Sequence, residues 1–94
     1  MFIVSLTYNK PIEEVEAYLE GHIEWLKRHY AQGIFVASGR KIPRTGGVIF
    51  AKTMDRQSLE SVLAEDPFNA VADYEIIEFA PSMTTDALDV LKSI

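Results

Sequence analysis

The chain has 94 residues, 48% of them hydrophobic, and this length and composition suit one compact domain. It has no cysteine, which excludes disulfide bonds, thiolate metal sites and a cysteine nucleophile. The net charge of -5 argues against binding to nucleic acid or to an anionic membrane. We therefore expect one domain over residues 1–94 with neither as a partner. A cytoplasmic location is also expected, because the sequence carries no signal peptide and no membrane-spanning run.

The first predicted element is a strand over Phe2–Tyr8, because larger apolar side chains alternate along it. A long amphipathic helix is predicted next, with Pro11 as an early helix residue and Gly33 as its C-terminal stop. The side chains predicted to form its apolar seam recur at helical spacing. They are Ile12, Val15, Leu19, Ile23, Leu26 and Tyr30.

Two short strands are predicted over Ile34–Ser38 and Gly46–Thr53, since both segments are rich in residues that favour strands. A second helix is predicted after Asp55, whose side chain suits the cap position. This helix should end near Asp66, because Pro67 disfavours a helical conformation in the residue before it.

The last predicted elements are a strand over Tyr74–Ala80 and a short C-terminal helix over Thr84–Leu91, with Thr84 or Thr85 as its cap. The order is βαββαβ followed by the extra helix. This order is typical of a ferredoxin-like α+β fold, in which two helices cover one face of a four-stranded antiparallel sheet.

Apolar side chains are predicted on both faces of this sheet, although the helices cover only one. Ile3 opposes Phe2 and Val4, and Ile77 opposes Ile76. A bare second face would exceed the apolar area that soluble monomers usually expose. Two sheets stacked across a two-fold axis would cover it, so we expect a homodimer.

A second stripe on the long helix consists of Tyr18, His22, Trp25 and His29, at spacings of four, three and four residues. One interpretation places this stripe at the border of the core or at a subunit contact, with both histidines hydrogen-bonded. The other places His22 in a cleft as a proton carrier. Nearly two helical turns separate the two histidines, so we expect no metal site.

A proton-carrying histidine needs a group that fixes its tautomer, and Asp66 is the leading candidate. Asp66 precedes Pro67 and Phe68, a pattern that also suits the cap of a short helical turn. The spacing by itself favours the cap.

Three cations, Arg40, Lys41 and Arg44, lie close together in a glycine-bordered loop of this acidic chain. They could hold an anionic substrate such as a carboxylate or a phenolate. The alternative is a solvated hairpin whose charges only favour solubility. The sequence supports the two interpretations equally.

The order of three segments resembles the YciI-like family: Gly21 to Leu26 with its histidine, Ala37-Ser38-Gly39, and Asp66-Pro67-Phe68. The resemblance covers nearly the whole chain and implies a dimeric α/β barrel with His22 and Asp66 paired in a cleft. The substrate-binding residues expected around that pair are Ser38, Gly39, Arg40, Arg44 and Phe68. Arg40 stands where many relatives have proline, so the pocket is expected to differ there.

One family member is a dehydrochlorinase that acts on a chlorinated hydroxyhydroquinone, which implies proton abstraction without a cofactor. We therefore expect a cofactor-free enzyme of lyase or isomerase type, in which His22 is the acid or base and Asp66 orients it. The expected substrate is a small anionic molecule, and an aromatic one is included in this expectation. The alternative is a non-catalytic binding or accessory module that holds a small metabolite.

Overall fold

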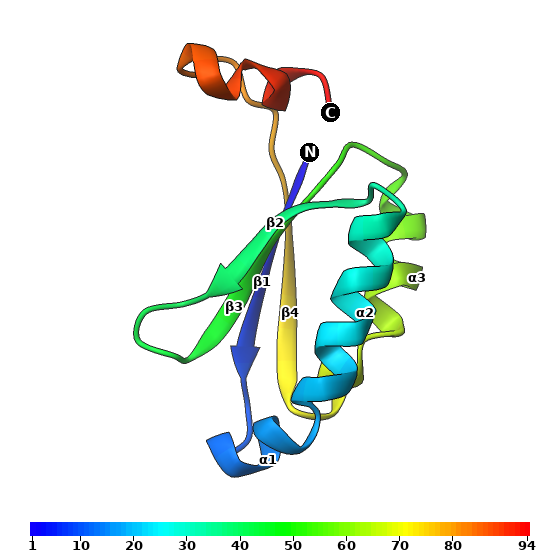
Figure 1. The fold of residues 1–94 in the computed structure, drawn as a ribbon, viewed down its shortest axis with the longest axis vertical. Coiled ribbons are helices and arrows are strands. Elements are labelled where there is room, and N and C mark those ends of the chain that lie inside the picture. The colour runs from blue at the N-terminus through cyan, green and yellow to red at the C-terminus, as the bar shows by residue number, and fades with distance from the viewer.

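Four strands form one antiparallel sheet in the order β2-β3-β1-β4, and helices cover one of its faces (Figure 1). This computed structural model describes residues 1–94. The strands are β1 (Phe2–Tyr8), β2 (Phe35–Arg40), β3 (Gly46–Ala51) and β4 (Ala72–Glu78). β1 pairs antiparallel with both β3 and β4, which interleaves the two halves of the chain. The predicted ferredoxin-like α+β fold is confirmed.

The helical elements differ from the prediction mainly in how the first helix is built. They are α1 (Ile12–Ala17), α2 (Leu19–Ala31), α3 (Arg56–Ala64), and the 3-10 helices η1 (Pro67–Ala70) and η2 (Asp86–Lys92). The predicted long helix is therefore interrupted at Tyr18, whose backbone N–H donates to the Val15 carbonyl at 3.0 Å. Such a bond to the third preceding residue is tighter than an α-helical turn and changes the direction of the side chains that follow.

This change of phase turns a different face of α2 toward the sheet. Ile23 and Tyr30, which were predicted to lie in the apolar seam, are 40% and 38% exposed. Trp25 and His29 are buried in their place, and the Trp25 indole N–H donates to the Val62 carbonyl at 3.0 Å. The predicted seam is thus wrong for Ile23 and Tyr30, because the helical wheel was continued through a turn that is not α-helical.

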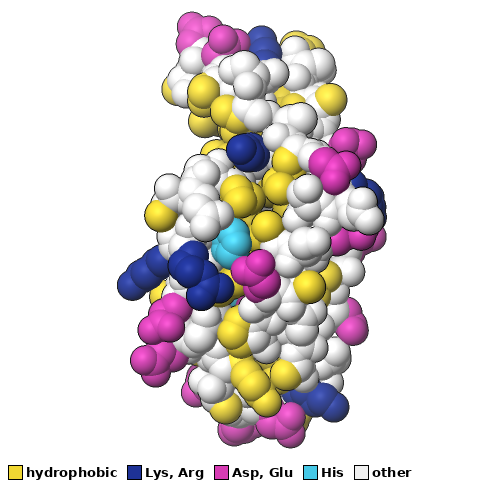
Figure 2. All heavy atoms as spheres, turned by 90° about the vertical axis from the view of Figure 1, so that its right-hand side faces the viewer, with side chains coloured by type: hydrophobic (Ala, Val, Ile, Leu, Met, Phe, Trp, Pro, Cys, Tyr) yellow, Lys and Arg dark blue, Asp and Glu magenta, His cyan; other side chains and the backbone are white.

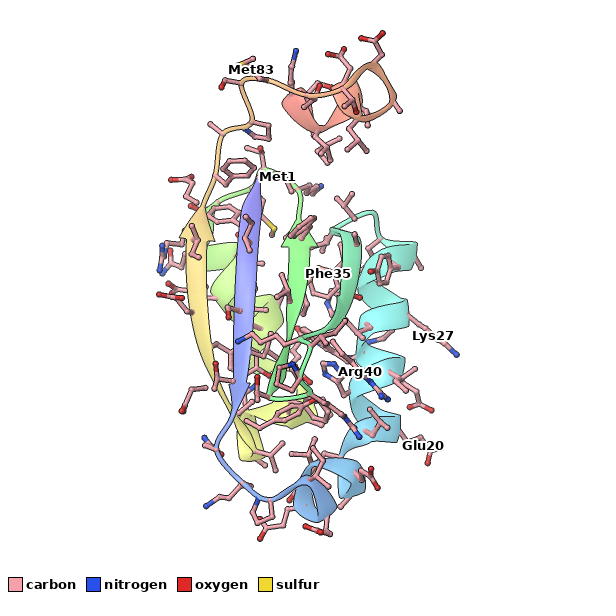
Figure 3. The ribbon with its side chains drawn as sticks, turned by 90° about the vertical axis from the view of Figure 1, so that its left-hand side faces the viewer. Met1, Glu20, Lys27, Phe35, Arg40 and Met83 are labelled. Atoms are coloured by element: carbon pink, nitrogen blue, oxygen red, sulfur yellow. The ribbon has the colours of Figure 1, made fainter.

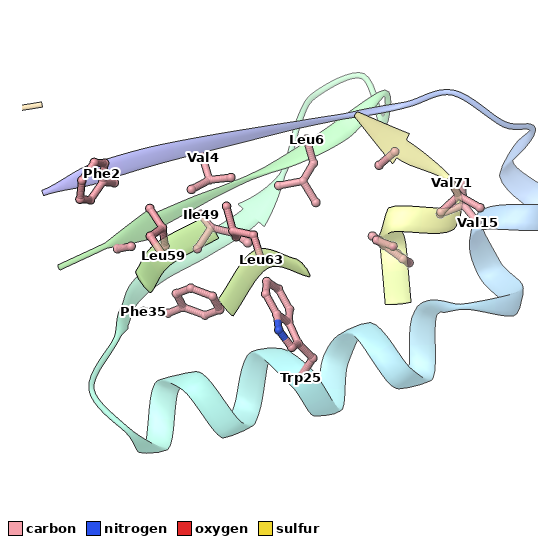
Figure 4. Close-up of a cluster of buried hydrophobic side chains, with 13 residues drawn as sticks. Phe2, Val4, Leu6, Val15, Trp25, Phe35, Ile49, Leu59, Leu63 and Val71 are labelled. Carbon is pink, nitrogen blue, oxygen red and sulfur yellow. The ribbon is translucent and has the colours of Figure 1, made fainter. Parts of the chain in front are cut away.

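The core lies between the inner face of the sheet and the helices α2 and α3 (Figure 4). α3 begins after Asp55, whose carboxylate accepts a hydrogen bond from the Ser58 N–H at 3.1 Å, so the predicted cap is confirmed. The 13 buried side chains of the core are Phe2, Val4, Leu6, Val15, Trp25, Phe35, Ile49, Ala51, Leu59, Leu63, Phe68, Val71 and Ala72.

The strand boundaries differ from the prediction by a few residues. β2 runs to Arg40 instead of stopping at Ser38, and a bulge lies between Phe35 and Ala37. β3 stops at Ala51, while β4 begins and ends two residues earlier than predicted. Gly39 and Arg40 therefore belong to a strand whose ladder with β3 fixes their position beside α2.

The C-terminal segment stands away from the body of the protein (Figures 1 and 2). The α-helix predicted over Thr84–Leu91 is instead the 3-10 helix η2, and Thr85 at its start makes no capping side-chain hydrogen bond. No residue of η2 is buried, and just after it the Ile94 carbonyl accepts a hydrogen bond from the Thr53 hydroxyl at 2.7 Å. None of the helices is both long enough and apolar enough to cross a lipid bilayer.

The outer face of the sheet, which faces the viewer in Figure 3, carries a row of apolar side chains. Ile3 on β1 lies opposite Phe50 on β3 and Ile77 on β4 in the strand register. Ile77 is 43% exposed, and no helix of the chain covers this row.

Candidate active site

His22 and Asp66 lie in contact, although 44 positions separate them in the sequence. His22 belongs to the first half of α2, and Asp66 precedes η1, which packs beside that helix. The His22 Nδ1 and Asp66 Oδ1 atoms are 2.8 Å apart, with the Asp66 side chain completely buried and the His22 side chain 12% exposed. The structure therefore brings together the two residues that the sequence singled out.

The same carboxylate oxygen also caps η1. Asp66 Oδ1 accepts a hydrogen bond from the Phe68 N–H at 2.9 Å, and Pro67 occupies the first position of the turn. The two interpretations of Asp66, as a cap and as a partner of His22, are thus compatible in one geometry. The cap fixes the direction in which the carboxylate faces the imidazole.

The second carboxylate oxygen of Asp66 accepts a hydrogen bond from the Tyr74 hydroxyl at 2.5 Å. Burial, and then the hydrogen bond to Asp66, raise the pKa of Tyr74 far above its ordinary value, so the phenol remains a donor. Tyr74 was not among the site residues predicted from the sequence. The available signal was its place in the row of β4 that also contains Ala72 and Ile76, whose side chains face the helices.

Aromatic side chains hold the His22 ring in place. The ring of Phe68 lies flat on it, with centroids 3.8 Å apart and an interplanar angle of 4°. Trp25 stacks against it at 5.6 Å and 29°. Because Nδ1 faces a buried carboxylate, the hydrogen-bond network assigns the ring hydrogen to Nδ1 and leaves the lone pair on Nε2.

A pocket of about 180 Å³ opens beside His22, between α2 and the strands β1, β2 and β3. Asp66 does not line this pocket and lies behind the imidazole, so ligand can reach the histidine but not the carboxylate. The other predicted site residues all line it. They are His22, Ser38, Gly39, Arg40, Arg44 and Phe68.

The three cations of the predicted basic loop have three different environments. Arg44 Nη1 lies 3.2 Å from Glu16 Oε1, and Lys41 Nζ donates to Thr7 Oγ1 at 3.1 Å. Burial alone would lower the pKa of Arg44, but side-chain hydrogen bonds to Tyr8 and Glu16 raise it. Arg40 lines the pocket without a carboxylate partner and lies beside α2 (Figure 3).

The remaining members of the helical stripe have structural environments. His29 is buried, and its Nδ1 lies 2.9 Å from the Trp25 carbonyl, while its Nε2 lies 3.8 Å from Glu65. Neither His29 nor Trp25 lines the pocket, so these two fit the core interpretation and His22 fits the cleft interpretation. No group of three or more His, Asp and Glu side chains is arranged to hold a metal ion.

Ser38 lies at the rim, where its hydroxyl is 2.7 Å from the Tyr30 hydroxyl. Charged side chains of both signs lie among apolar ones on the face of the molecule shown in Figure 2. The site is a small, largely apolar pocket whose lining includes an oriented imidazole and the side chains of Arg40 and Arg44.

The chain matches a known protein family over most of its length. The model of the family described as YCII-related domain matches residues 1–80, which include all four strands and both residues of the His22–Asp66 pair. The match ends before η2. No curated protein matches the chain.

Proposed function

We propose that this chain, which belongs to the YCII-related domain family, is a cofactor-free enzyme that transfers a proton on a small anionic substrate. The observation that carries the proposal is the contact of 2.8 Å between His22 Nδ1 and the buried Asp66 carboxylate, in the wall of a pocket. A carboxylate in this position leaves Nε2 as the proton acceptor and stabilises the imidazolium that forms.

The reaction begins when His22 Nε2 accepts a proton from a carbon atom of the bound substrate. The electron pair left on that carbon either expels a leaving group or moves within the substrate. If a leaving group is expelled, the imidazolium gives its proton to that group or to water, and the enzyme is a lyase. If the electron pair moves within the substrate, the imidazolium returns the proton at another position, and the enzyme is an isomerase. A positioned base of this kind contributes roughly 10²- to 10⁴-fold in rate.

We also propose that the functional assembly is a homodimer joined through the outer sheet face. The row of Phe50, Ile3 and Ile77 lies across three neighbouring strands, which gives a continuous apolar surface. A two-fold axis through this surface would stack one sheet on the other and cover the same row in both chains.

Hydrogen exchange with solvent tests the proposed reaction without knowledge of the natural substrate. Small carboxylic acids and phenols are incubated with the protein in D₂O, and NMR detects deuterium incorporation or elimination. We expect the wild-type protein to act on a subset of the compounds, and His22→Gln to lower the rate by roughly 10²- to 10⁴-fold. Lys41→Ala is the matched control, because Lys41 lies outside the pocket.

The second candidate function is a binding module that holds a small metabolite without converting it. The pocket favours this candidate because eight of the 15 residues that line it are hydrophobic, and such side chains bind a ligand without reacting with it. Saturable binding of compounds that neither exchange hydrogen nor eliminate would support it and would contradict the enzyme proposal.

A further inference from the structure

The charges around the pocket leave one cation without a partner. Arg44 is paired with Glu16 through Nη1, although its buried Nε has no hydrogen-bond partner. The carboxylate of Asp66 is occupied by hydrogen bonds from its neighbours. Lys41 donates to Thr7 and does not line the pocket. Of the two arginines that line the pocket, only Arg40 has no carboxylate partner, so one positive charge is left to neutralise a negative charge of a ligand.

A second negative charge on the ligand would meet only the guanidinium of Arg44, whose charge Glu16 already offsets. Eight of the 15 residues that line the pocket are hydrophobic, and the buried side chains of Leu6 and Ile49 belong to the sheet side of its wall. An unpaired charge against such a lining loses its hydration without compensation. A dianion is therefore disfavoured relative to a monoanion with an apolar body.

The size of the pocket limits the ligand further. A cavity of about 150 Å³ in another protein holds benzene. A pocket of about 180 Å³ therefore suits one six-membered ring, or a short alkyl chain, together with one small polar group. Gly39 in the pocket wall has open space at its Cβ position, so no side chain narrows the entrance there.

Arg40 and His22 both line the pocket, one from the end of β2 and the other from α2. A guanidinium binds a carboxylate through two parallel hydrogen bonds, which orients the ligand as well as attracting it. The same cation offsets negative charge that develops on a nearby carbon when His22 removes a proton.

From these observations we infer that the pocket binds a small monocarboxylate with an apolar body, and that Arg40 is its anchor. Arg44 instead holds the loop through its ion pair with Glu16. The inference rests on the proposed function, because it names the substrate class of the same site.

Binding of probe acids to the full chain tests the inference. In ¹⁵N-resolved NMR titrations, benzoate and pentanoate should shift the backbone amide signals of Gly39 and Gly47 in a saturable way. Benzamide is the neutral match for benzoate, and succinate is the dianionic match for pentanoate. We expect each of these two to bind at least about tenfold more weakly than its match, since a charge-assisted hydrogen bond contributes roughly that factor.

Variants separate the two arginines. Arg40→Gln should weaken benzoate binding about tenfold or more, and Arg40→Lys should restore part of the loss because it keeps the charge without the bidentate geometry. Arg44→Gln and the control Lys41→Ala should change it by less than about threefold. A larger loss in Arg44→Gln than in Arg40→Gln, equal binding of succinate and pentanoate, or no benzoate binding by the wild-type protein would each overturn the inference.

Failure of the monocarboxylate inference can be distinguished from failure of the proposed enzyme activity by measuring binding and hydrogen exchange separately. His22→Gln should keep benzoate binding while losing hydrogen exchange. Benzoate binding through Arg40 with no exchange of any compound would contradict the enzyme and leave the binding site intact. Exchange that is confined to compounds without a carboxylate would contradict the monocarboxylate assignment and leave the enzyme intact.

Discussion

Asp66 accepts three hydrogen bonds, from the Phe68 N–H, the Tyr74 hydroxyl and the His22 ring. A buried carboxylate is costly unless such donors replace its lost hydration. Phe68 belongs to η1 and Tyr74 to β4. Donors from two elements other than α2 therefore fix the direction in which the carboxylate faces the imidazole. The orientation of His22 therefore depends in part on Asp66 and Tyr74, which do not line the pocket.

Tyr74→Phe tests this arrangement by removing only the hydroxyl that donates to Asp66. The substitution leaves a buried carboxylate oxygen without its donor, so we expect the free energy of unfolding at neutral pH to fall by about 1 to 3 kcal/mol. Urea denaturation measures the change. Tyr30→Phe is the matched control, because its hydrogen bond to Ser38 is exposed and its loss should cost less than about 1 kcal/mol. Equal effects of the two variants would contradict the role of Tyr74.

The raised pKa of Tyr74 predicts a pH dependence of stability. The unfolded chain releases the phenol proton near pH 10, whereas the folded chain holds it to higher pH. The contribution of Tyr74 is therefore complete below about pH 10 and is lost as the pH rises further. In urea denaturation between about pH 8 and pH 11, the wild-type protein should lose stability more steeply than Tyr74→Phe. Parallel pH profiles would show that Tyr74 titrates alike in the two states.

At the scale of the elements, the close approach of β3 to β1 depends on one glycine. A Cβ atom on Gly46 would lie 1.8 Å from the Leu6 carbonyl oxygen, so an added methyl group must push the two strands apart. We expect Gly46→Ala to lower the free energy of unfolding by about 3 kcal/mol, as overpacking of a core does. The matched control is Gly39→Ala, since nothing lies within 4 Å of a Cβ there. A stability change in Gly46→Ala no larger than in the control would contradict this account of the β1–β3 ladder.

The elements also show what local patterns can and cannot predict. The order of strands and helices, the Asp55 cap and the glycine stop at Gly33 could be predicted because each depends on a few neighbouring residues. The interruption at Tyr18 could not, because neither proline nor glycine marks it. The seam that followed was wrong at Ile23 and Tyr30, whereas Leu19 and Leu26 do pack against the core.

At the scale of the whole molecule, the candidate site is assembled from segments far apart in the sequence. The pairing of His22 with Asp66 was predicted from a family resemblance and not from spacing, which favoured a cap alone. The partners Tyr74 and Glu16 were missed, because a hydrogen bond across 8 or 28 positions leaves no local pattern. Arg44 differs from Arg40 because Arg44 pairs with Glu16, and this contact could not be predicted from the sequence.

The proposed homodimer makes a prediction at this scale. Wild-type protein should have twice the chain mass of 10.6 kDa in light scattering at micromolar concentration. Phe50→Asp places a charge in the apolar row of the outer face, so we expect it to shift the mass to that of one chain. Ser61→Asp, on the exposed side of α3, is the matched control and should leave the mass unchanged. A wild-type mass of one chain would contradict the dimer.

The central claim is that a buried carboxylate holds His22 with its proton acceptor toward the pocket. The most direct test is the tautomer of His22 in long-range ¹H–¹⁵N NMR spectra of the full chain at about pH 8, with His29 as an internal reference. The predicted result is a hydrogen on Nδ1 and a bare Nε2, and a shift toward the Nε2–H tautomer in Asp66→Ala with the His29 signals unchanged. A hydrogen on Nε2 in the wild-type protein, or no change of tautomer in Asp66→Ala, would contradict the claim.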